Sequence, residues 1–191
     1  MCSSDLMESQ NQHGMPLLLG GFEEGSSVQP LEQIHLSKSQ SGDTRYDEDW
    51  LQGLIMRHPS LLPMRQIEPA FYPLVSVCRE LPNGNNSLDV LLVTPNGDLA
   101  LVECKLYRNP EARRKVIAQI LDYAKGMSAW DYEALEQAVS RARKAAGKAG
   151  DDSAKLYDLV AGMGDTDEAS FHDAVSRNLR RGRFLLLIVG D

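Results

Sequence analysis

The sequence contains little cysteine and few aromatic residues, and it lacks long apolar runs. Its 3 cysteines in 191 residues cannot form a disulfide framework, and its 4 histidines are too scattered for a zinc site. No segment is long and apolar enough for a transmembrane helix or a signal peptide, so a cytoplasmic location is the default expectation. The absence of a Gly-rich phosphate loop and of a Ser–His–Asp set excludes the common nucleotide-binding and serine-hydrolase patterns.

Charge is unevenly distributed along the chain. The formal net charge is −7, from 20 basic and 27 acidic residues. Residues 1–50 contain 9 of the acidic and 2 of the basic residues, which leaves 18 of each for residues 51–191. The overall negative charge therefore does not exclude a nucleic-acid partner for the later part of the chain, where basic residues occur in local clusters.

The first 42 residues differ in composition from the rest. Residues 7–42 are rich in Gln, Ser and Gly and have weak hydrophobic periodicity, which predicts a mobile leader over residues 1–42. Residues 1–6, MCSSDL, resemble the translation of a sequencing adapter, so no role is assigned to Cys2. Residues 43–191 are numerous enough to form one domain around a single core.

Two apolar runs in the middle of the chain predict a β-hairpin. Leu88–Thr94 and Asp98–Lys105 are apolar at odd and even positions alike, as in strands that are covered on both faces. Residues 95–97, Pro-Asn-Gly, suit a three-residue loop, with proline at the first turn position and glycine at the left-handed one. In the register that this loop sets, Asp89 faces Glu103, with Cβ atoms about 4.5–5.5 Å apart.

The facing carboxylates require a compensating charge. Like charges opposite one another are unfavourable unless a cation or a shared proton lies between them, and a divalent metal is the simpler explanation. Lys105 projects from the same strand face as Glu103, so its ammonium group can reach the same volume. Two acids and a lysine suit phosphodiester hydrolysis, which needs ligands for Mg²⁺ or Mn²⁺ and a cation near the phosphorus. The alternative is a solvated Glu-x-Lys on an exposed strand, which the apolar context disfavours.

At these residues the sequence resembles the PD-(D/E)XK nuclease superfamily, which has a restriction-endonuclease-like fold. Asp89, Glu103 and Lys105 match its two acids and its lysine, with Leu88 in place of the proline in the motif's name. The run from about Tyr46 to Ala134 resembles an uncharacterised bacterial branch through segments such as Glu-Cys-Lys-Leu and Asn-Pro-Glu-Ala-Arg-Arg. The resemblance implies a magnesium-dependent endonuclease, with DNA expected over RNA because it is the commoner substrate in this superfamily.

The resemblance also implies roles for residues around the motif. Gln119 and Tyr123 resemble a Gln-x-x-x-Tyr pattern on the following helix, in which Gln119 would position the attacking water and Tyr123 would support it. The backbone carbonyl of Cys104 would join the two acids as a metal ligand, and Glu48 is the candidate for a further acid from the first helix. Phosphate contacts are expected from Arg108, Arg113, Arg114 and Lys115. The alternatives are a helix-flank Gln119, a half-buried Tyr123, a dipole partner at Glu48 and a solvated basic helix face.

The hydrophobic patterns predict, in order, a helix at 46–58, a strand at 74–81, the hairpin, a helix from 109, a helix at 131–146, short helices near 153–161 and 168–181, and a strand at 184–189. We therefore expect an α/β fold with an αβββαβ core. In this core a central mixed sheet is flanked by helices, and a helical insertion precedes the last strand.

The sequence leaves open where the domain ends, its oligomeric state and alternative functions. Because the last predicted strand ends close to Asp191, we expect the domain to continue beyond this residue. The oligomeric state is undetermined, and a homodimer is one option. A second functional hypothesis is a nucleic-acid-binding or assembly module that keeps the fold without cleaving, although such a module could replace its buried charges by apolar residues. A third is an unrelated α/β enzyme with a Glu–Lys pair.

Overall fold

The computed structural model describes residues 17–19, 27–30, 47–84, 86–105, 110–147 and 155–190, without the side chains at 17–19, 28, 30 and 110–113. The chain divides into two units, residues 1–35 and 36–191. In the first unit, β1 (Leu17–Leu19) pairs antiparallel with β2 (Val28–Pro30), which the weak periodicity of the predicted leader did not indicate. No described helix is long and apolar enough to cross a membrane.

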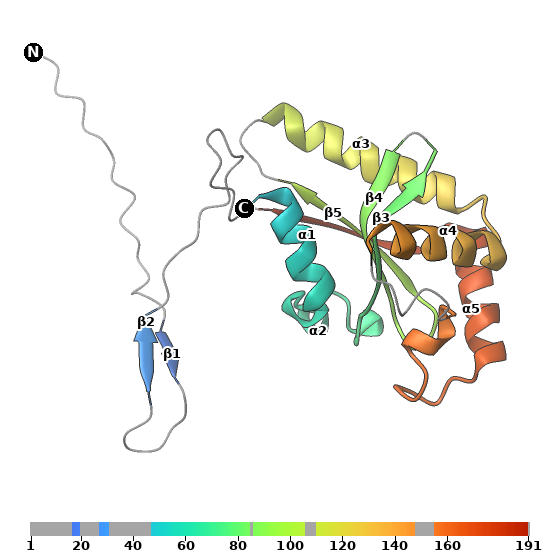
Figure 1. Ribbon diagram of the computed structural model, residues 1–191, viewed down its shortest axis with the longest axis horizontal. Helices are drawn as coiled ribbons and strands as arrows, with labels where there is room; N and C mark the ends of the chain where they lie inside the picture. The colour runs from blue at the N-terminus through green and yellow to red at the C-terminus, as the bar shows by residue number, and fades with distance from the viewer. Residues whose placement is uncertain are drawn as a thin grey trace, which may run out of the picture. The chain divides into compact units, whose positions relative to one another are not determined.

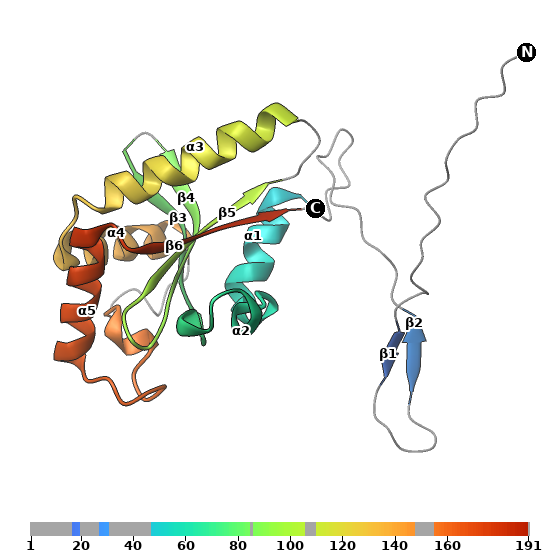
Figure 2. The same cartoon turned by 180° about the vertical axis from the view of Figure 1, so that it is seen from behind.

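The second unit is built on a four-stranded mixed sheet (Figure 1). Its strands lie in the order β3 (Val75–Asn83), β4 (Asn86–Val93), β5 (Leu99–Lys105) and β6 (Phe184–Gly190). Neighbours among β3, β4 and β5 are antiparallel, whereas β6 runs parallel to β5 and is seen best from behind (Figure 2). The predicted mixed sheet is confirmed.

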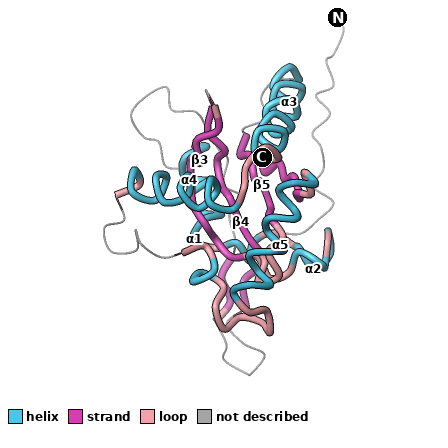
Figure 3. Tube along the Cα trace, turned by 90° about the vertical axis from the view of Figure 1, so that its right-hand side faces the viewer, coloured by secondary structure: helices cyan, strands magenta, loops and turns pink. Residues whose placement is uncertain are grey.

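Helices flank the strands (Figure 3). In Figures 1 and 2 the helices that precede β3 in the chain lie to one side of the sheet, and the last two helices of the chain lie to the other. The first group comprises α1 (Glu48–Arg57), η1 (Pro59–Leu61), α2 (Met64–Ile67) and η2 (Pro69–Phe71). The later elements are α3 (Pro110–Met127), α4 (Tyr132–Ala145), η3 (Tyr157–Leu159) and α5 (Glu168–Arg181).

The strands separate two apolar clusters. Leu99 and Leu101 of β5 pack with residues of α3, α4 and α5, whereas Ala100 and Val102 pack with residues of α1. All four side chains are fully buried. Because successive strand residues alternate between faces, the next odd-numbered positions of β5 lie toward the α3 side. Alternation therefore places Glu103 on the α3 side, while Lys105, the last residue of β5, contacts Glu48 of α1.

The hairpin between β4 and β5 has the predicted loop and register. The ladder pairs Val90 with Val102 and Val93 with Leu99, and one further step in this register places residue 89 opposite residue 103. Residues 94 and 98 close the loop through a backbone hydrogen bond of 2.9 Å. Gly97 takes the left-handed conformation, with φ at 81°.

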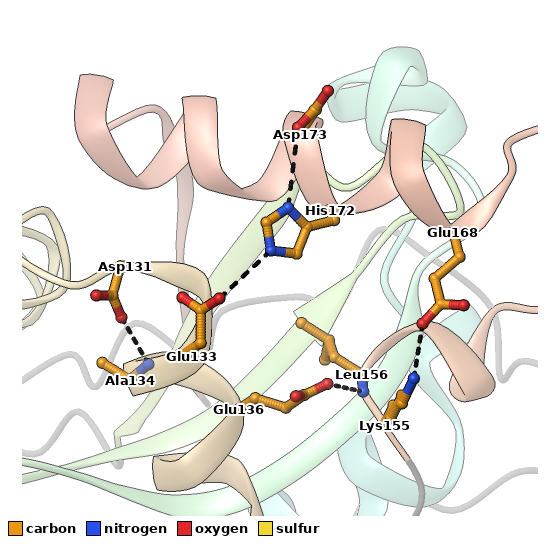
Figure 4. Close-up of polar contacts among 9 residues, drawn as sticks. All are labelled: Asp131, Glu133, Ala134, Glu136, Lys155, Leu156, Glu168, His172 and Asp173. Carbon is orange, nitrogen blue, oxygen red and sulfur yellow. Dashed lines mark hydrogen bonds and ion pairs between the residues drawn. The ribbon is translucent and has the colours of Figure 1, made fainter.

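Polar contacts connect α4, the residues just before η3, and α5 (Figure 4). Asp131 caps α4 by accepting from the backbone N of Ala134 at 2.8 Å, as predicted, and Glu136 accepts from the backbone N of Leu156 at 3.0 Å. The helices predicted at 131–146 and 168–181 are confirmed. Near 153–161 the described residues form only the 3₁₀ helix η3, because Gly162 follows within one turn in a left-handed conformation, with φ at 77°.

Candidate functional site

A cavity of about 560 Å³ lies at the end of β5, between α1 and α3. Its walls come from α1, from the turn between β3 and β4, from β4 and β5, and from α3. The residues that line it include seven that the sequence singled out: Glu48, Asp89, Glu103, Cys104, Lys105, Gln119 and Tyr123. Side chains that are far apart in the sequence therefore converge on one cavity.

The two strand acids are buried in the wall of this cavity. Asp89 is 9% exposed and Glu103 is 2% exposed. The Asp89 Oδ2 atom accepts a hydrogen bond of 2.7 Å from the backbone N–H of Cys104, and the Gln52 side chain provides a second hydrogen bond to this carboxylate. In contrast, the buried Oε2 atom of Glu103 has no hydrogen-bond partner among the described residues. An unpartnered carboxylate oxygen is costly, so this atom is suited to a ligand.

Lys105 contributes the cation of the site. Its Nζ atom lies 3.2 Å from Oε2 of Glu48, which comes from the first turn of α1. Both side chains are about one quarter exposed, so the pair borders both protein and solvent. The contact joins α1 to the end of β5.

Burial raises the pKa values of both acids. The pKa of Glu103 rises from 4.5 to about 8, first through burial and then through the negative charge of Asp89. Burial also raises the pKa of Asp89, from 3.8 to about 6, while the hydrogen bond from the Cys104 backbone N–H opposes the rise. Two neighbouring acids that both resist ionisation form a site in which a cation would be favourable.

The stability of the metal-free protein is expected to fall as the pH rises from about 5 to about 8. In this range the folded state binds more protons than the unfolded state, because the folded pKa values of Asp89 and Glu103 are the higher ones. Stability from these groups is therefore present at low pH and is lost as the pH passes the folded values. Melting temperatures (Tm) measured in EDTA across this range check the prediction. A Tm that rises steadily with pH would contradict it.

Residues of α3 complete the opposite wall. The Gln119 Nε2 atom donates a hydrogen bond of 2.8 Å to the Tyr123 hydroxyl oxygen. Tyr123 is 1% exposed, and burial raises its pKa. The two residues lie one helical turn apart and are joined by this hydrogen bond, while their predicted roles in catalysis stay predictions.

The predicted phosphate-contacting residues have different outcomes. Arg108 lies outside the described residues, as does the side chain of Arg113. Arg114 and Lys115 are exposed on α3, and neither is among the described residues that line the cavity. Their contact with phosphate stays a prediction.

The sequence did not identify three residues that surround Asp89. Gln52 and Arg79 form a hydrogen-bonded chain toward it, and the charge of Glu80 contributes to its raised pKa. Glu80 has a left-handed backbone with φ at 49°, a conformation that costs about 1–2 kcal/mol for a non-glycine residue. The available signal was the spacing of Gln52, four residues after Glu48 and so on the same helix face.

Within the described ranges, no three His, Cys, Asp or Glu side chains form a set that could hold a metal ion. Of the three acids that line the cavity, Asp89 and Glu103 are buried, and Glu48 forms an ion pair with Lys105. Comparisons of the chain with protein-family models, with curated proteins and with solved structures find no match, so the interpretation of this site depends on its own geometry.

Proposed function

We propose that this chain is a metal-dependent nuclease of the PD-(D/E)XK type, with a restriction-endonuclease-like core, that hydrolyses phosphodiester bonds in DNA. One observation carries the proposal: two buried acids, close enough for the charge of Asp89 to raise the pKa of Glu103, line a single cavity together with a lysine. Like charges in such a position are unfavourable without a cation. The order of helix, three strands, helices and a final parallel strand supports the fold assignment.

The residues present fit a magnesium or manganese ion. Mg²⁺ keeps several of its waters and is usually bound by only one or two carboxylates, so the lack of a third acidic ligand is compatible with it. Asp89 and Glu103 would hold the ion, and the unpartnered Oε2 atom of Glu103 supplies an acceptor with no competing donor among the described residues. The Cys104 backbone carbonyl would be a further ligand, as the resemblance implies.

The protein groups would divide the remaining work. A bound metal ion would lower the pKa of a water and polarise a phosphoryl oxygen. Lys105, held at the cavity by Glu48, would stabilise the negative charge that develops at phosphorus. Gln119, with its amide nitrogen bound to Tyr123, would position the attacking water through its amide oxygen.

DNA recognition would rely on the phosphate backbone. Arg114 and Lys115 are exposed on α3, the helix that also carries Gln119, and exposed basic residues there are suited to phosphates flanking the scissile one. These contacts would give affinity for DNA without sequence preference, so no recognition sequence is assigned.

Cleavage of plasmid, linear and single-stranded DNA by the purified protein tests the proposal. We expect cutting with Mg²⁺ or Mn²⁺ and none in EDTA. The Lys105→Ala variant should lose at least about 100-fold in rate, because one preorganised cation or donor at the reacting centre is commonly worth this much.

The matched control is Lys125→Ala, which removes an exposed lysine from the last turn of α3. It should cleave at nearly the wild-type rate. Folded wild-type protein that cuts none of the three DNAs with either metal would contradict the nuclease assignment. If that protein still retained DNA, the non-cleaving binding module would become the better assignment.

A further inference from the structure

Gln52 is a polar residue in an otherwise apolar part of α1. It is 7% exposed and lies between Leu51 and Ile55, two residues of the apolar cluster on this face of the sheet. A buried amide needs hydrogen-bond partners, since an unpaired one costs about 1–3 kcal/mol. Its partners therefore indicate why a polar side chain occupies this position.

The partners of Gln52 are Arg79 of β3 and Asp89 of β4. The Arg79 Nη2 atom donates to the Gln52 Oε1 atom at 2.8 Å, and the Gln52 side chain makes a hydrogen bond to the Asp89 carboxylate. A guanidinium group can only donate, and a carboxylate can only accept. The amide oxygen must therefore face Arg79 and the amide NH₂ must face Asp89. Arg79 thus determines the orientation of the amide.

Asp89 is held by donors from two directions. The backbone N–H of Cys104 donates to its Oδ2 atom at 2.7 Å, and the Gln52 NH₂ group donates from α1. Two donors from separate elements fix both the position of a carboxylate and the plane of its oxygens. The remaining lone pairs are then presented in one direction, which a metal ligand requires.

We propose that Gln52 is a positioning residue that holds the Asp89 carboxylate on the Cys104 amide, and that Arg79 sets the orientation of its side chain. The inference rests on the proposed function for its consequence, since Asp89 positioned in this way is the proposed metal ligand. The chain of contacts from Arg79 through Gln52 to Asp89 also gives α1 two links to the site, because Glu48 contacts Lys105 one helical turn earlier.

Hydrogen exchange of the Cys104 amide in EDTA tests the positioning role without metal or substrate. In Gln52→Met, which preserves side-chain length, the amide should exchange about tenfold faster, the equivalent of one net hydrogen bond. The amide of Ala100, earlier in β5, should change little. Gln52→Glu is the second variant, because it keeps an acceptor for Arg79 but replaces the donor to Asp89 by a carboxylate that repels it. It should also accelerate exchange at Cys104.

Mn²⁺ binding, measured by electron paramagnetic resonance of the free ion, tests the link to the metal site. Gln52→Met should bind Mn²⁺ about 10–100-fold more weakly than wild type, as is typical when a partner of a metal ligand is lost. The control is Asp49→Ala, which removes the other partner of Arg79. Asp49 is 80% exposed, so this variant should stay within about twofold of wild type.

The outcomes separate the two proposals. Unchanged Cys104 exchange in both Gln52 variants would overturn the positioning role, whatever the metal result. Faster exchange together with a wild-type protein that binds no Mn²⁺ would support the positioning role and contradict the proposed metal site. Faster exchange with unchanged Mn²⁺ affinity would overturn the link between them.

Discussion

Replacing Glu103 by glutamine is expected to raise the Tm of the metal-free protein at pH 8 and to remove most of the stabilisation by Mg²⁺. The variant loses a buried charge that the charge of Asp89 opposes, and a neutral amide at this position is less costly to bury than a carboxylate. We expect a gain of about 2–5 °C in EDTA. Wild type at a saturating Mg²⁺ concentration should gain about 5–10 °C, whereas the variant should gain little.

Differential scanning fluorimetry in EDTA and in Mg²⁺, at pH 6 and pH 8, measures both effects. The advantage of the variant in EDTA should shrink at pH 6, where Glu103 itself is mainly protonated, since its pKa is raised to about 8. Glu133→Gln serves as the control, because this acid is exposed on α4 and lies 3.8 Å from the imidazole of His172, away from the cavity residues. Equal stabilisation of all three proteins by Mg²⁺ would place metal binding elsewhere.

A Gly97→Ala substitution is expected to lower the free energy of unfolding by about 2–4 kcal/mol. The added Cβ would lie 3.0 Å from the Ala174 Cβ atom and 3.1 Å from backbone atoms of Phe171 and Val175. Backbone atoms of α5 cannot move aside as a flexible side chain can. The left-handed φ of 81° adds a conformational cost that alanine bears and glycine does not.

The Gly97 carbonyl also receives a buried hydrogen bond of 3.0 Å from the Asn178 side chain, so displacement of α5 would weaken a further contact. Urea unfolding measures the loss. Gly162→Ala is the matched control: its φ of 77° is similar, but no described atom lies within 4 Å of the position that its added Cβ would take. It should cost only about 1 kcal/mol, which is the conformational part. Equal losses in the two variants would show that contact with α5 contributes nothing.

The sequence predicted those parts of the fold that depend on local signals. The loop at residues 95–97 set the β4–β5 register, which the structure confirms from Val93–Leu99 to Val90–Val102 and which, extended by one step, places residue 89 opposite residue 103. Caps such as Asp131 defined helix starts because their side chains accept from the next turn. Apolar runs of seven or eight residues marked the central strands, since both of their faces are buried.

Parts that depend on long-range contacts were not predictable. The three-residue strands β1 and β2 have no alternation long enough to detect. In the sequence, Gln52 resembled any polar residue at the edge of an apolar stripe. Its proposed role depends on a hydrogen bond with Arg79, which is 27 positions later in the chain. The left-handed Glu80 carries no residue-type signal, since glutamate rarely adopts that conformation. The roles of the site residues remain proposals.

The two strands that pair with β5 are separated from it by very different lengths of chain. β4 is joined to β5 by a short loop, whereas 78 residues separate the end of β5 from its parallel partner β6. Closing the longer segment costs more chain entropy, so the pairing of β5 with β6 should form late in folding. The hairpin would then bring the two acids together in a partly folded chain, before the sheet is complete. Their mutual repulsion would act as a kinetic penalty on early folding, which a divalent cation in the refolding buffer would relieve.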